Sequence, residues 1–365
     1  MAAMTATTAS PWVITGRGAA AGIPGLVAGH QVFAVASATA ARRTRLTSWL
    51  PGDATLFHHF QPNPTADQAI SAAAARSAAG ADLVLGVGGG SALDIAKAAR
   101  ALPPDPASAA RAIAGTGACP RAEVQLVLVP TTAGTGSEVT RFAAFYRRGR
   151  KMSLDAACVQ ADIAVIDSGL TDSCPAPLTW SCAFDAVAHA VESTWSTRAT
   201  SQSRAYAIAA LALLVPVLRD ADHLPTMAER DTLSEAGTLA GRAIDFTRTT
   251  AAHALAYPLT AHLGVPHGLA CALNLTWLAP MIEPGWRGPA ANALRDVLGV
   301  PEGGLGAGIS ELLVRRGLQT TLGPVDAAIA EVIVDEGLAS NRISGTPIAL
   351  DRRRVRASVG ELLGC

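Results

Sequence analysis

The chain has 365 residues, of which half are apolar and 16% are charged. This composition excludes a disordered chain and indicates extensive burial. Because single domains rarely grow beyond about 250–300 residues, two domains are expected. The 29 acidic and 29 basic residues balance to a formal net charge of zero, which points to neither nucleic acid nor an anionic membrane as a partner. A near-neutral surface favours self-association, and a homodimer is expected.

The start of the chain and its apolar runs carry no targeting or membrane signal. Residues 1–11 are rich in Ala, Thr and Ser but lack a basic region followed by an apolar one. No uninterrupted apolar run reaches the ~18–20 residues that span a bilayer. The six cysteines are scattered without a CxxC pair and are interpreted as reduced, buried thiols. Cys182 lies three residues before Asp185, so contact with a metal is an alternative role for it, but a buried core cysteine is favoured. A cytoplasmic protein is expected.

Short β-rich runs alternate with Ala-rich helical stretches up to about Asp172, as in a doubly wound parallel sheet. Strands are predicted over 31–37, 82–87, 124–129 and 164–167, and helices over 65–80 and 92–102. The Pro- and Ala-rich residues 103–110 are expected to form a surface loop. These elements predict an α/β dinucleotide-binding domain over residues 1–172.

The second half of the chain changes character after Cys174. Strand-like runs disappear, and long stretches with helical periodicity follow, for example 180–195 and 203–218. The turn-rich residues 167–177 are the natural boundary. An all-α domain over 173–365 is therefore predicted, with a cleft between the two domains.

Two small-residue loops follow predicted strands. The first contains Gly88, Gly89, Gly90 and Ser91 and opens a helix, where backbone N–H groups can meet a phosphate. The second runs over 131–137 and contains Thr131, Thr132 and Thr135. Either loop alone is also ordinary tight-turn chemistry. Two of them at strand ends of one sheet favour a nucleotide crevice.

Four potential metal ligands lie in the second half. Asp185 and His189 are four residues apart on one predicted helix and face the same way. His253 and His267 follow downstream. One carboxylate and three imidazoles suit Fe(II) or Zn(II), with a position left for a substrate oxygen. The alternative for the Asp185 and His189 pair is a simple hydrogen bond.

Taken together, these motifs resemble the iron-containing alcohol dehydrogenases, whose order and approximate spacing they share over residues 62–273. The matching residues are Gly88, Gly89, Gly90, Ser91, Asp94, Lys97, 131–138, Asp185, His189, His253 and 266–268. The resemblance implies the fold that this family shares with dehydroquinate synthase. It also implies a metal held by Asp185, His189, His253 and His267. Glu192, one turn beyond His189, is a candidate partner of these ligands.

The resemblance also implies residues that bind NADH or NADPH. They are Ser37, Asn63, Gly88, Gly89, Gly90, Ser91, Asp94, Thr131, Thr132, Thr135, Ala144 and Lys151. Many members that prefer NAD have an acidic residue after the first strand, whereas this chain has Ser37 followed by Arg42 and Arg43. Loss of that carboxylate removes repulsion toward a 2′-phosphate, so NADPH is at least tolerated.

A narrower similarity concerns the substrate. Residues 151–155, 192–196, 247–255 and 257–260 look like those of phosphonoacetaldehyde reductases, which make 2-hydroxyethylphosphonate in phosphonate natural-product pathways. The phosphonate is expected to meet Arg248, Thr249 and Thr250, just before His253, with Arg141 as a further candidate. The alternative for Arg248 is an ion pair with Asp245 or Glu192.

The sequence does not decide which group donates a proton to the alkoxide that the reduction forms. Many family members have a histidine four residues after the third ligand, where this chain has Tyr257. Tyr257, His262, the cofactor ribose and water are the candidates, and Lys151 is counted with the catalytic residues. Rival activities are a maleylacetate or general short-chain alcohol enzyme of the same family, or a metal-dependent lyase of the dehydroquinate synthase type, without net cofactor turnover.

Overall fold

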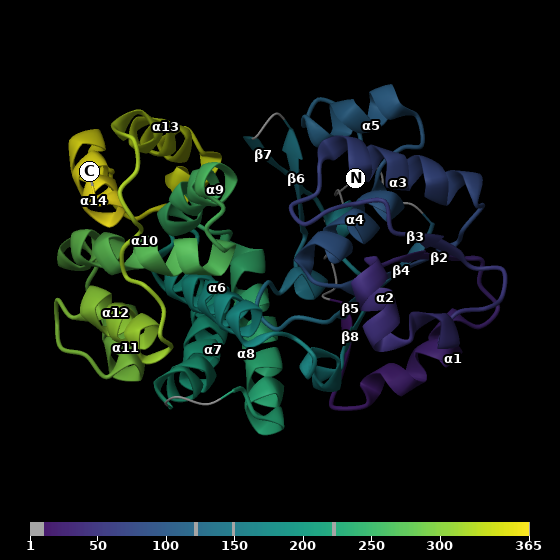
Figure 1. Ribbon diagram of the computed structural model, residues 1–365, viewed down its shortest axis with the longest axis horizontal. Coiled ribbons are helices and arrows are strands. Elements are labelled where there is room, and N and C mark those ends of the chain that lie inside the picture. Colours follow the sequence, from purple (N-terminus) through teal and green to yellow (C-terminus); the bar gives the residue numbers. More distant parts are fainter. Residues whose placement is uncertain (1–10, 120–122, 148–149, 221–223, 365) are drawn as a thin grey trace, which may run out of the picture. The chain divides into compact units, whose positions relative to one another are not determined.

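The computed structural model of the chain describes residues 11–119, 123–147, 150–220 and 224–364 (Figure 1). The chain divides into two compact units. Unit 1 comprises the chain up to Thr132 together with Ser137–Ser173, and unit 2 comprises Ala133–Gly136 together with the chain from Cys174 onward.

Unit 1 is built on a six-stranded parallel sheet with the strand order β1-β8-β5-β4-β2-β3. The strands are β1 (Trp12–Thr15), β2 (Val32–Val35), β3 (Thr55–Phe57), β4 (Leu83–Gly88), β5 (Gln125–Pro130) and β8 (Ile163–Ile166). All four strands predicted from the sequence are found, within one to two residues at most ends. The predicted α/β fold with a parallel sheet is therefore confirmed.

Helices cover both faces of this sheet (Figure 1). They are α1 (Ile23–Val27), α2 (Ala38–Thr44), α3 (Ala66–Ala78), α4 (Gly90–Ala101) and α5 (Pro106–Ile113). Alternate residues of β2 explain why: Val32 and Ala34 pack in the core with α1, while Phe33 and Val35 pack with α3 and α4. A fully buried parallel strand of this kind is apolar on both faces.

Unit 1 also contains an antiparallel hairpin of β6 (Phe142–Arg147) and β7 (Arg150–Asp155). Short 3₁₀ helices complete the described part of the chain, at Ala19–Gly22, Leu46–Ser48, Ser137–Val139, Ala157–Val159, Ser168–Thr171, Glu283–Gly285 and Asn341–Gly345. The last two of these lie in unit 2.

The prediction of a surface loop over residues 103–110 is wrong, because most of this segment belongs to α5. Asp105 caps this helix, its carboxylate accepting a hydrogen bond from the Ser108 N–H at 2.8 Å. Pro106 occupies the first helical position, where its missing N–H costs nothing. Ala109 and Ala112 then bury one face in the core. The proline thus begins a helix here instead of preventing one.

Two cysteines of unit 1 lie against each other. The Sγ atoms of Cys119 and Cys158 are 2.6 Å apart, and the hydrogen bond between the thiols lowers the pKa of Cys158, which favours its reaction as a thiolate. We expect hydrogen peroxide to convert the pair to a disulfide, with the two thiol hydrogens and the peroxide leaving as water. Peptide mapping without reductant would detect the link. Recovery of both thiols in alkylatable form after peroxide treatment would contradict it.

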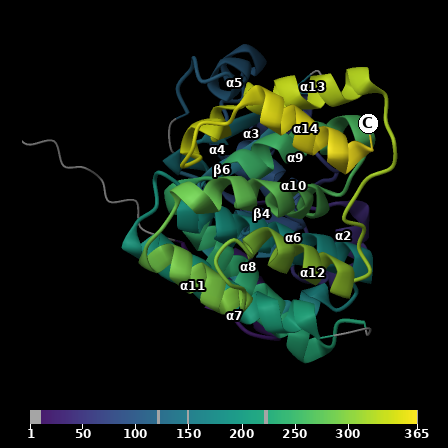
Figure 2. The same cartoon turned by 90° about the vertical axis from the view of Figure 1, so that its left-hand side faces the viewer.

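Unit 2 is helical throughout its described residues. Its helices are α6 (Ala176–Trp195), α7 (Ser201–Arg219), α8 (Met227–Thr247), α9 (Ala251–Leu263), α10 (His267–Ile282), α11 (Pro289–Leu298), α12 (Leu305–Arg315), α13 (Ala327–Leu338) and α14 (Arg352–Leu363). In Figure 2, α13 and α14 lie side by side in yellow. The all-α second half and its two predicted helices are confirmed, although α6 begins four residues earlier than predicted.

Among the described residues, α7 alone is long and apolar enough to cross a membrane by length and composition. Its residues Ala207, Leu211 and Leu214 are fully buried in the core of unit 2. The helix packs on α6 and α8. Its apolar character is thus accounted for by packing within the unit.

Candidate metal centre and nucleotide-binding loops

The centre of unit 2 begins on α6, a helix buried along almost its whole length. Asp185 and His189 are one turn apart on one face of this helix, as predicted. The Asp185 Oδ1 atom lies 3.6 Å from the His189 Nε2 atom, and both side chains are less than 10% exposed. Placing two polar side chains inside an apolar helix is unfavourable unless they have partners.

The partners come from α9 and α10. The His253 Nε2 atom lies 3.2 Å from Asp185 Oδ1, and the His267 Nε2 atom lies 3.9 Å from the same oxygen. His267 is the first residue of α10, and Gly268 lets this helix approach α6: a Cβ at Gly268 would lie 1.8 Å from the Ser181 carbonyl oxygen. The sequence-distant residues therefore converge on one carboxylate.

Replacing Gly268 with alanine is expected to move α10 away from α6. A change of side-chain rotamer cannot relieve the clash, because the atom that the new methyl group meets belongs to the backbone. We expect a loss of stability of about 1–3 kcal/mol or more, together with weaker metal binding. Thermal unfolding and a metal titration would measure the two effects. Gly285→Ala is the matched control, since its Cβ meets only Ile348 at 3.6 Å; equal behaviour of both variants would refute the packing argument.

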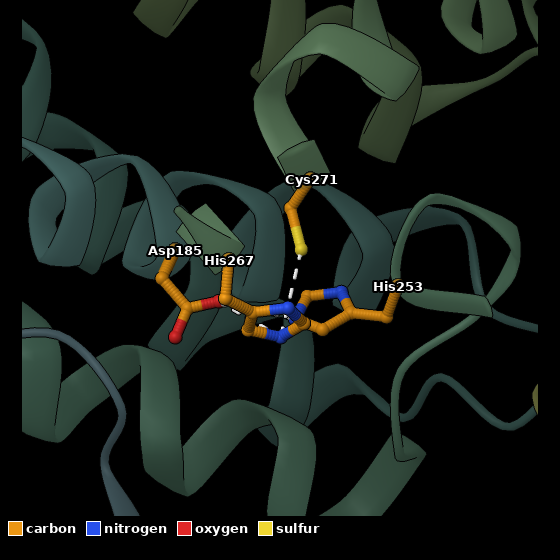
Figure 3. A group of neighbouring side chains, drawn as sticks. All are labelled: Asp185, His253, His267 and Cys271. Atoms are coloured by element: carbon orange, nitrogen blue, oxygen red, sulfur yellow. Dashed lines mark hydrogen bonds and ion pairs between the residues drawn. The ribbon is translucent and has the colours of Figure 1, made fainter. Parts of the chain in front are cut away.

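Cys271 also belongs to the cluster, which the sequence analysis did not predict. Ligand atoms of Asp185, His253, His267 and Cys271 all lie within 4.8 Å of one another (Figure 3). The Cys271 Sγ atom is 3.8 Å from His267 Nε2. His189 stands beside this group, its ring stacked on that of His253 with centroids 4.7 Å apart.

Glu192 orients His253 from behind. Its Oε2 atom lies 2.5 Å from His253 Nδ1, the nitrogen that faces away from Asp185. The other oxygen, Oε1, accepts hydrogen bonds from the Thr250 hydroxyl at 2.6 Å and from the Ala252 N–H at 2.8 Å. A carboxylate that binds the second nitrogen of a ligating imidazole fixes the tautomer and the ring orientation. Glu192, expected as a partner of the metal ligands, thus contacts His253.

Thr250 is given a different role from the predicted one. Its side chain is fully buried. Its hydroxyl donates to Glu192 and accepts from the Trp195 indole N–H at 3.1 Å. With both functions of the hydroxyl in use, Thr250 serves to hold Glu192 in place and is not available to a phosphonate.

The charges of the cluster shift its pKa values. Burial raises the pKa of the Asp185 carboxyl, but the neighbouring histidines, led by His189, outweigh burial and hold that pKa well below its usual range. Burial raises the pKa of the Cys271 thiol to about 11. Burial lowers the pKa of His253, but Cys271 and Glu192 outweigh it and raise the pKa well above its usual value. The site therefore holds an anionic carboxylate in a buried environment that attracts a cation.

The donor set fits a divalent metal. An ionised carboxylate and imidazole nitrogens, gathered in a buried place, are ligands that Fe(II) and Zn(II) accept. The orientation of His253 by a buried carboxylate is typical of metal-binding histidines. Asp185, His253 and His267 lie close enough together to hold such an ion, and His189, expected as the fourth ligand, lies beside them.

Tyr257 and His262 differ in their relation to this centre. The Tyr257 ring stacks on the His267 ring, with centroids 5.5 Å apart and 12° between the planes. His262 lies nine residues after His253 on α9, about 13 Å along the helix axis. Its Nε2 atom lies 2.9 Å from a carboxylate oxygen of Glu336. Tyr257 is therefore next to the ligands, whereas His262 belongs to a surface pair.

In unit 1 the first glycine loop lies where the strand order reverses. The chain passes from β2 to β3 on one side and then to β4 on the other side of β2. Nucleotides bind at the carboxyl ends of strands at such a point. Ser37 follows β2, and its hydroxyl caps α2 by accepting the Ala40 N–H at 3.1 Å. Gly88 ends β4 with a φ of +150°, and a Cβ there would lie 2.7 Å from that of Ala92.

The second loop runs beside the first. The Thr131 N–H donates to the Gly88 carbonyl at 2.9 Å, and a Cβ at Gly89 would lie 3.4 Å from the side chain of Thr132. Asn63 lies beside them, with a φ of 56° and its N–H donating to the Ser91 hydroxyl at 3.1 Å. These residues of unit 1 thus lie together, and their role in cofactor binding stays a prediction.

Asp94 supports the loops from within unit 1. Its carboxylate accepts hydrogen bonds from the Ser137 hydroxyl at 2.9 Å and the Ala144 N–H at 3.0 Å. Burial raises its pKa, against the opposing charge of Lys97. Lys97 is fully buried and donates to the carbonyl and hydroxyl of Thr140 at 3.0 and 3.2 Å. Asp94 and Lys97 therefore tie α4 to the segment that enters the hairpin.

Thr135 lies in the middle part of the second loop, Ala133–Gly136, which belongs to unit 2, whereas Thr131, Thr132 and Ser137 belong to unit 1. The glycines on either side pack against unit 2 helices: a Cβ at Gly134 would lie 2.1 Å from the Cys182 carbonyl oxygen, and one at Gly136 would lie 2.4 Å from Gly241 Cα. Close packing alone thus requires these glycines. Lys151 and Tyr146 are paired residues of the hairpin in unit 1.

Arg248 adopts an unusual backbone conformation between α8 and α9. Its φ of 60° and ψ of −178° lie in a region that is almost restricted to glycine. Its N–H donates to the Ile244 carbonyl at 2.7 Å, and its side chain is half-buried. Thr249 follows it and is buried. Strain of this kind is most often kept at functional sites.

Comparison with known families decides the identity of this arrangement. The model of the iron-containing alcohol dehydrogenases matches residues 10–168, and that of the C-terminal region of the Fe-containing alcohol dehydrogenase family matches residues 179–298. The chain belongs to the iron-containing alcohol dehydrogenase family. It is an NAD(P)-dependent oxidoreductase of the alcohol dehydrogenase and aldehyde reductase class.

Several relatives of this alcohol dehydrogenase are named enzymes. It is 34% identical to the phosphonoacetaldehyde reductase of Streptomyces viridochromogenes, over 88% of this chain and 85% of that protein. It is 32% identical to the probable alcohol dehydrogenase EutG of Escherichia coli, over 73% and 69%. The sulfoacetaldehyde reductase of Bifidobacterium kashiwanohense, solved with NAD⁺, superposes with a TM-score of 0.87 and 26% identity, over 97% of this chain and 98% of that one.

The sequence analysis missed two features of this alcohol dehydrogenase, the place of Cys271 in the cluster and the hydrogen bond between Thr250 and Glu192. Cys271 lies four residues after His267, the same spacing as Asp185 and His189, so the sequence did indicate that the two side chains share a helical face. No sequence signal pointed to the hydrogen bond between Thr250 and Glu192, because the two residues are 58 positions apart and meet only through packing.

Proposed function

We propose that this enzyme reduces phosphonoacetaldehyde to 2-hydroxyethylphosphonate with NADH or NADPH, as a step of phosphonate natural-product biosynthesis. The similarity to the phosphonoacetaldehyde reductase over 88% of the chain carries the proposal. The substrate class, a two-carbon aldehyde with a tetrahedral anion, also suits the residues before α9.

Arg248 and Thr249 support an anion site at the start of α9. A guanidinium can bind a phosphonate through two parallel hydrogen bonds. The N-terminus of the 13-residue helix adds a favourable dipole for a negative charge. His253 is in the first turn of this helix, so an anion bound there would lie near the metal ligands. Arg141, in unit 1, stays a prediction.

The chain's own residues prepare the reaction. When bound, Fe(II) or Zn(II) would supply Lewis acidity and the reduced nicotinamide would supply the hydride. With a metal bound, Glu192 would keep the proton of His253 on Nδ1 and leave the Nε2 lone pair to the ion. Tyr257, stacked on His267, is the residue best placed to donate a proton to the new alcohol oxygen. His262 is engaged by Glu336 and is not proposed for this role.

NADPH is proposed as an accepted cofactor. Arg42 and Arg43 are exposed on α2, the helix that follows β2 and begins after Ser37. A guanidinium at this position can bind a 2′-phosphate. The homodimer and the cytoplasmic location stay predictions.

Sulfoacetaldehyde is the second candidate substrate. The chain is 33% identical to the sulfoacetaldehyde reductase of Bilophila wadsworthia, over 59% of this chain and 56% of that protein. A sulfonate has the same tetrahedral shape as a phosphonate but carries one negative charge instead of up to two. An arginine site discriminates between them by charge.

A panel of aldehydes tests the proposal. The anaerobically Fe(II)-loaded enzyme would be assayed with phosphonoacetaldehyde, sulfoacetaldehyde, acetaldehyde and maleylacetate, each with NADH and NADPH. We expect the highest kcat/KM with phosphonoacetaldehyde. A higher value with another aldehyde would replace the proposed substrate, and absence of substrate-dependent cofactor oxidation would favour a lyase of the dehydroquinate synthase type.

A further inference from the structure

We propose that Cys271 is a sulfur donor to the metal centre, in addition to the carboxylate and the histidines, and that it shifts the metal preference toward thiophilic ions. The inference rests on the metal site of the proposed function but not on its substrate. It concerns the thiol of Cys271, which would change the metal ions that the site prefers.

The position of Cys271 follows from the geometry of α10. His267 begins the helix, and residues four apart lie on the same helical face, so the Cys271 side chain lies one turn beyond the His267 ring. Its Sγ atom is 3.8 Å from His267 Nε2. Figure 3 shows the sulfur directed at the imidazoles of His253 and His267.

The surroundings of the thiol are those of a ligand. Cys271 is fully buried, and its sulfur lies within 4.8 Å of the ligand atoms of Asp185, His253 and His267. A cysteine packed as a small apolar residue would face other apolar side chains. Cys271 packs in the apolar core of unit 2, but its sulfur also lies next to a carboxylate and two imidazole rings, which are donors that can surround a single ion.

Asn274 closes the same side of α10. It lies one turn beyond Cys271 and is fully buried, and its side-chain N–H donates to the carbonyl of Ala252, the residue before His253, at 3.1 Å. This bond ties α10 to the ligand-bearing turn of α9. The part of α10 that carries Cys271 is therefore tied to the turn that carries His253.

A sulfur donor alters metal selectivity in a definite direction. Thiolates favour zinc and other soft ions, whereas carboxylate and water favour magnesium and manganese. Removing the sulfur should thus weaken the binding of Zn(II) and Co(II) more than the binding of Mn(II). We expect the ratio of Zn(II) to Mn(II) affinity to fall by roughly 10-fold or more in Cys271→Ser, by analogy with the loss of other groups that support a metal.

The Co(II)-substituted protein gives the most direct test. Sulfur coordination produces a near-ultraviolet charge-transfer absorption that oxygen and nitrogen ligands do not. We expect this band in the wild-type protein and in Cys174→Ser, whose buried thiol is outside the cluster, and its loss in Cys271→Ser. Cobalt binding without the band in the wild type would overturn the proposal, whatever the variants do.

Two outcomes separate this inference from the proposed function. If Co(II) binds without sulfur absorption and phosphonoacetaldehyde is still reduced, the cysteine proposal fails alone. If no Co(II) binds to the wild-type protein, the metal centre fails and both proposals fall. Persistence of the band in a folded Cys271→Ser protein, judged by circular dichroism, would also refute the assignment to Cys271.

Discussion

Replacing Glu192 with glutamine is expected to lower the affinity for the divalent metal by about 10–100-fold. Two donors, the Thr250 hydroxyl and the Ala252 N–H, require an oxygen at the Oε1 position. The amide nitrogen of glutamine would then face His253 Nδ1 and donate to it. The proton of that imidazole would move to Nε2, the nitrogen that faces Asp185, and leave it unable to bind a metal.

A metal titration of the Glu192→Gln protein, with circular dichroism to verify the fold, measures this effect. Glu336→Gln is the matched control, because it removes a carboxylate that also pairs with a histidine, His262, but at the surface. We expect its metal affinity to equal that of the wild type. An unchanged affinity in Glu192→Gln would show that His253 does not depend on this carboxylate.

Replacing Arg248 with glycine should separate stability from substrate binding. Glycine adopts the φ of 60° without strain, so the free energy of unfolding should rise by about 1 kcal/mol after the entropy cost of glycine is deducted. Loss of a charge-assisted contact worth about 1.5–3 kcal/mol should lower kcat/KM for phosphonoacetaldehyde by about 10–150-fold. Acetaldehyde has no anionic group, and its kcat/KM should not change.

Arg248→Ala is the companion variant, since it removes the guanidinium but keeps a side chain in the strained conformation. We expect the same loss with phosphonoacetaldehyde and no gain in stability. Chemical denaturation and steady-state kinetics measure both quantities. An equal loss with acetaldehyde and phosphonoacetaldehyde would contradict an anion-binding role for Arg248.

Local patterns predicted much of unit 1 from the sequence. The apolar runs of β2, β4 and β5 are short and bounded by glycine or polar residues, so they indicated buried parallel strands. The capping residues also carried information: Thr65 begins α3 with a capping box, at the predicted start of that helix. The exception was α5, where a proline that begins a helix was taken as a mark of a loop.

The metal centre was only partly predictable, because its members meet through packing of three helices. The spacing of Asp185 and His189 on one helix was visible in the sequence. Nothing in the sequence alone placed His253 and His267 beside them, and the resemblance to a family supplied that step. Cys271 and Thr250 were assigned other roles, since neither a buried thiol nor a threonine next to an arginine reveals its partner before the helices are packed.

The metal content of the purified chain tests the central claim most directly. The protein would be loaded anaerobically with Fe(II), freed of excess metal and analysed for iron per chain, beside the Asp185→Ala variant. We expect one iron per wild-type chain and a nearly complete loss in the variant, because the oxygen that both neighbouring imidazoles approach is then missing. Undiminished iron in a folded Asp185→Ala protein would contradict a centre built on this carboxylate.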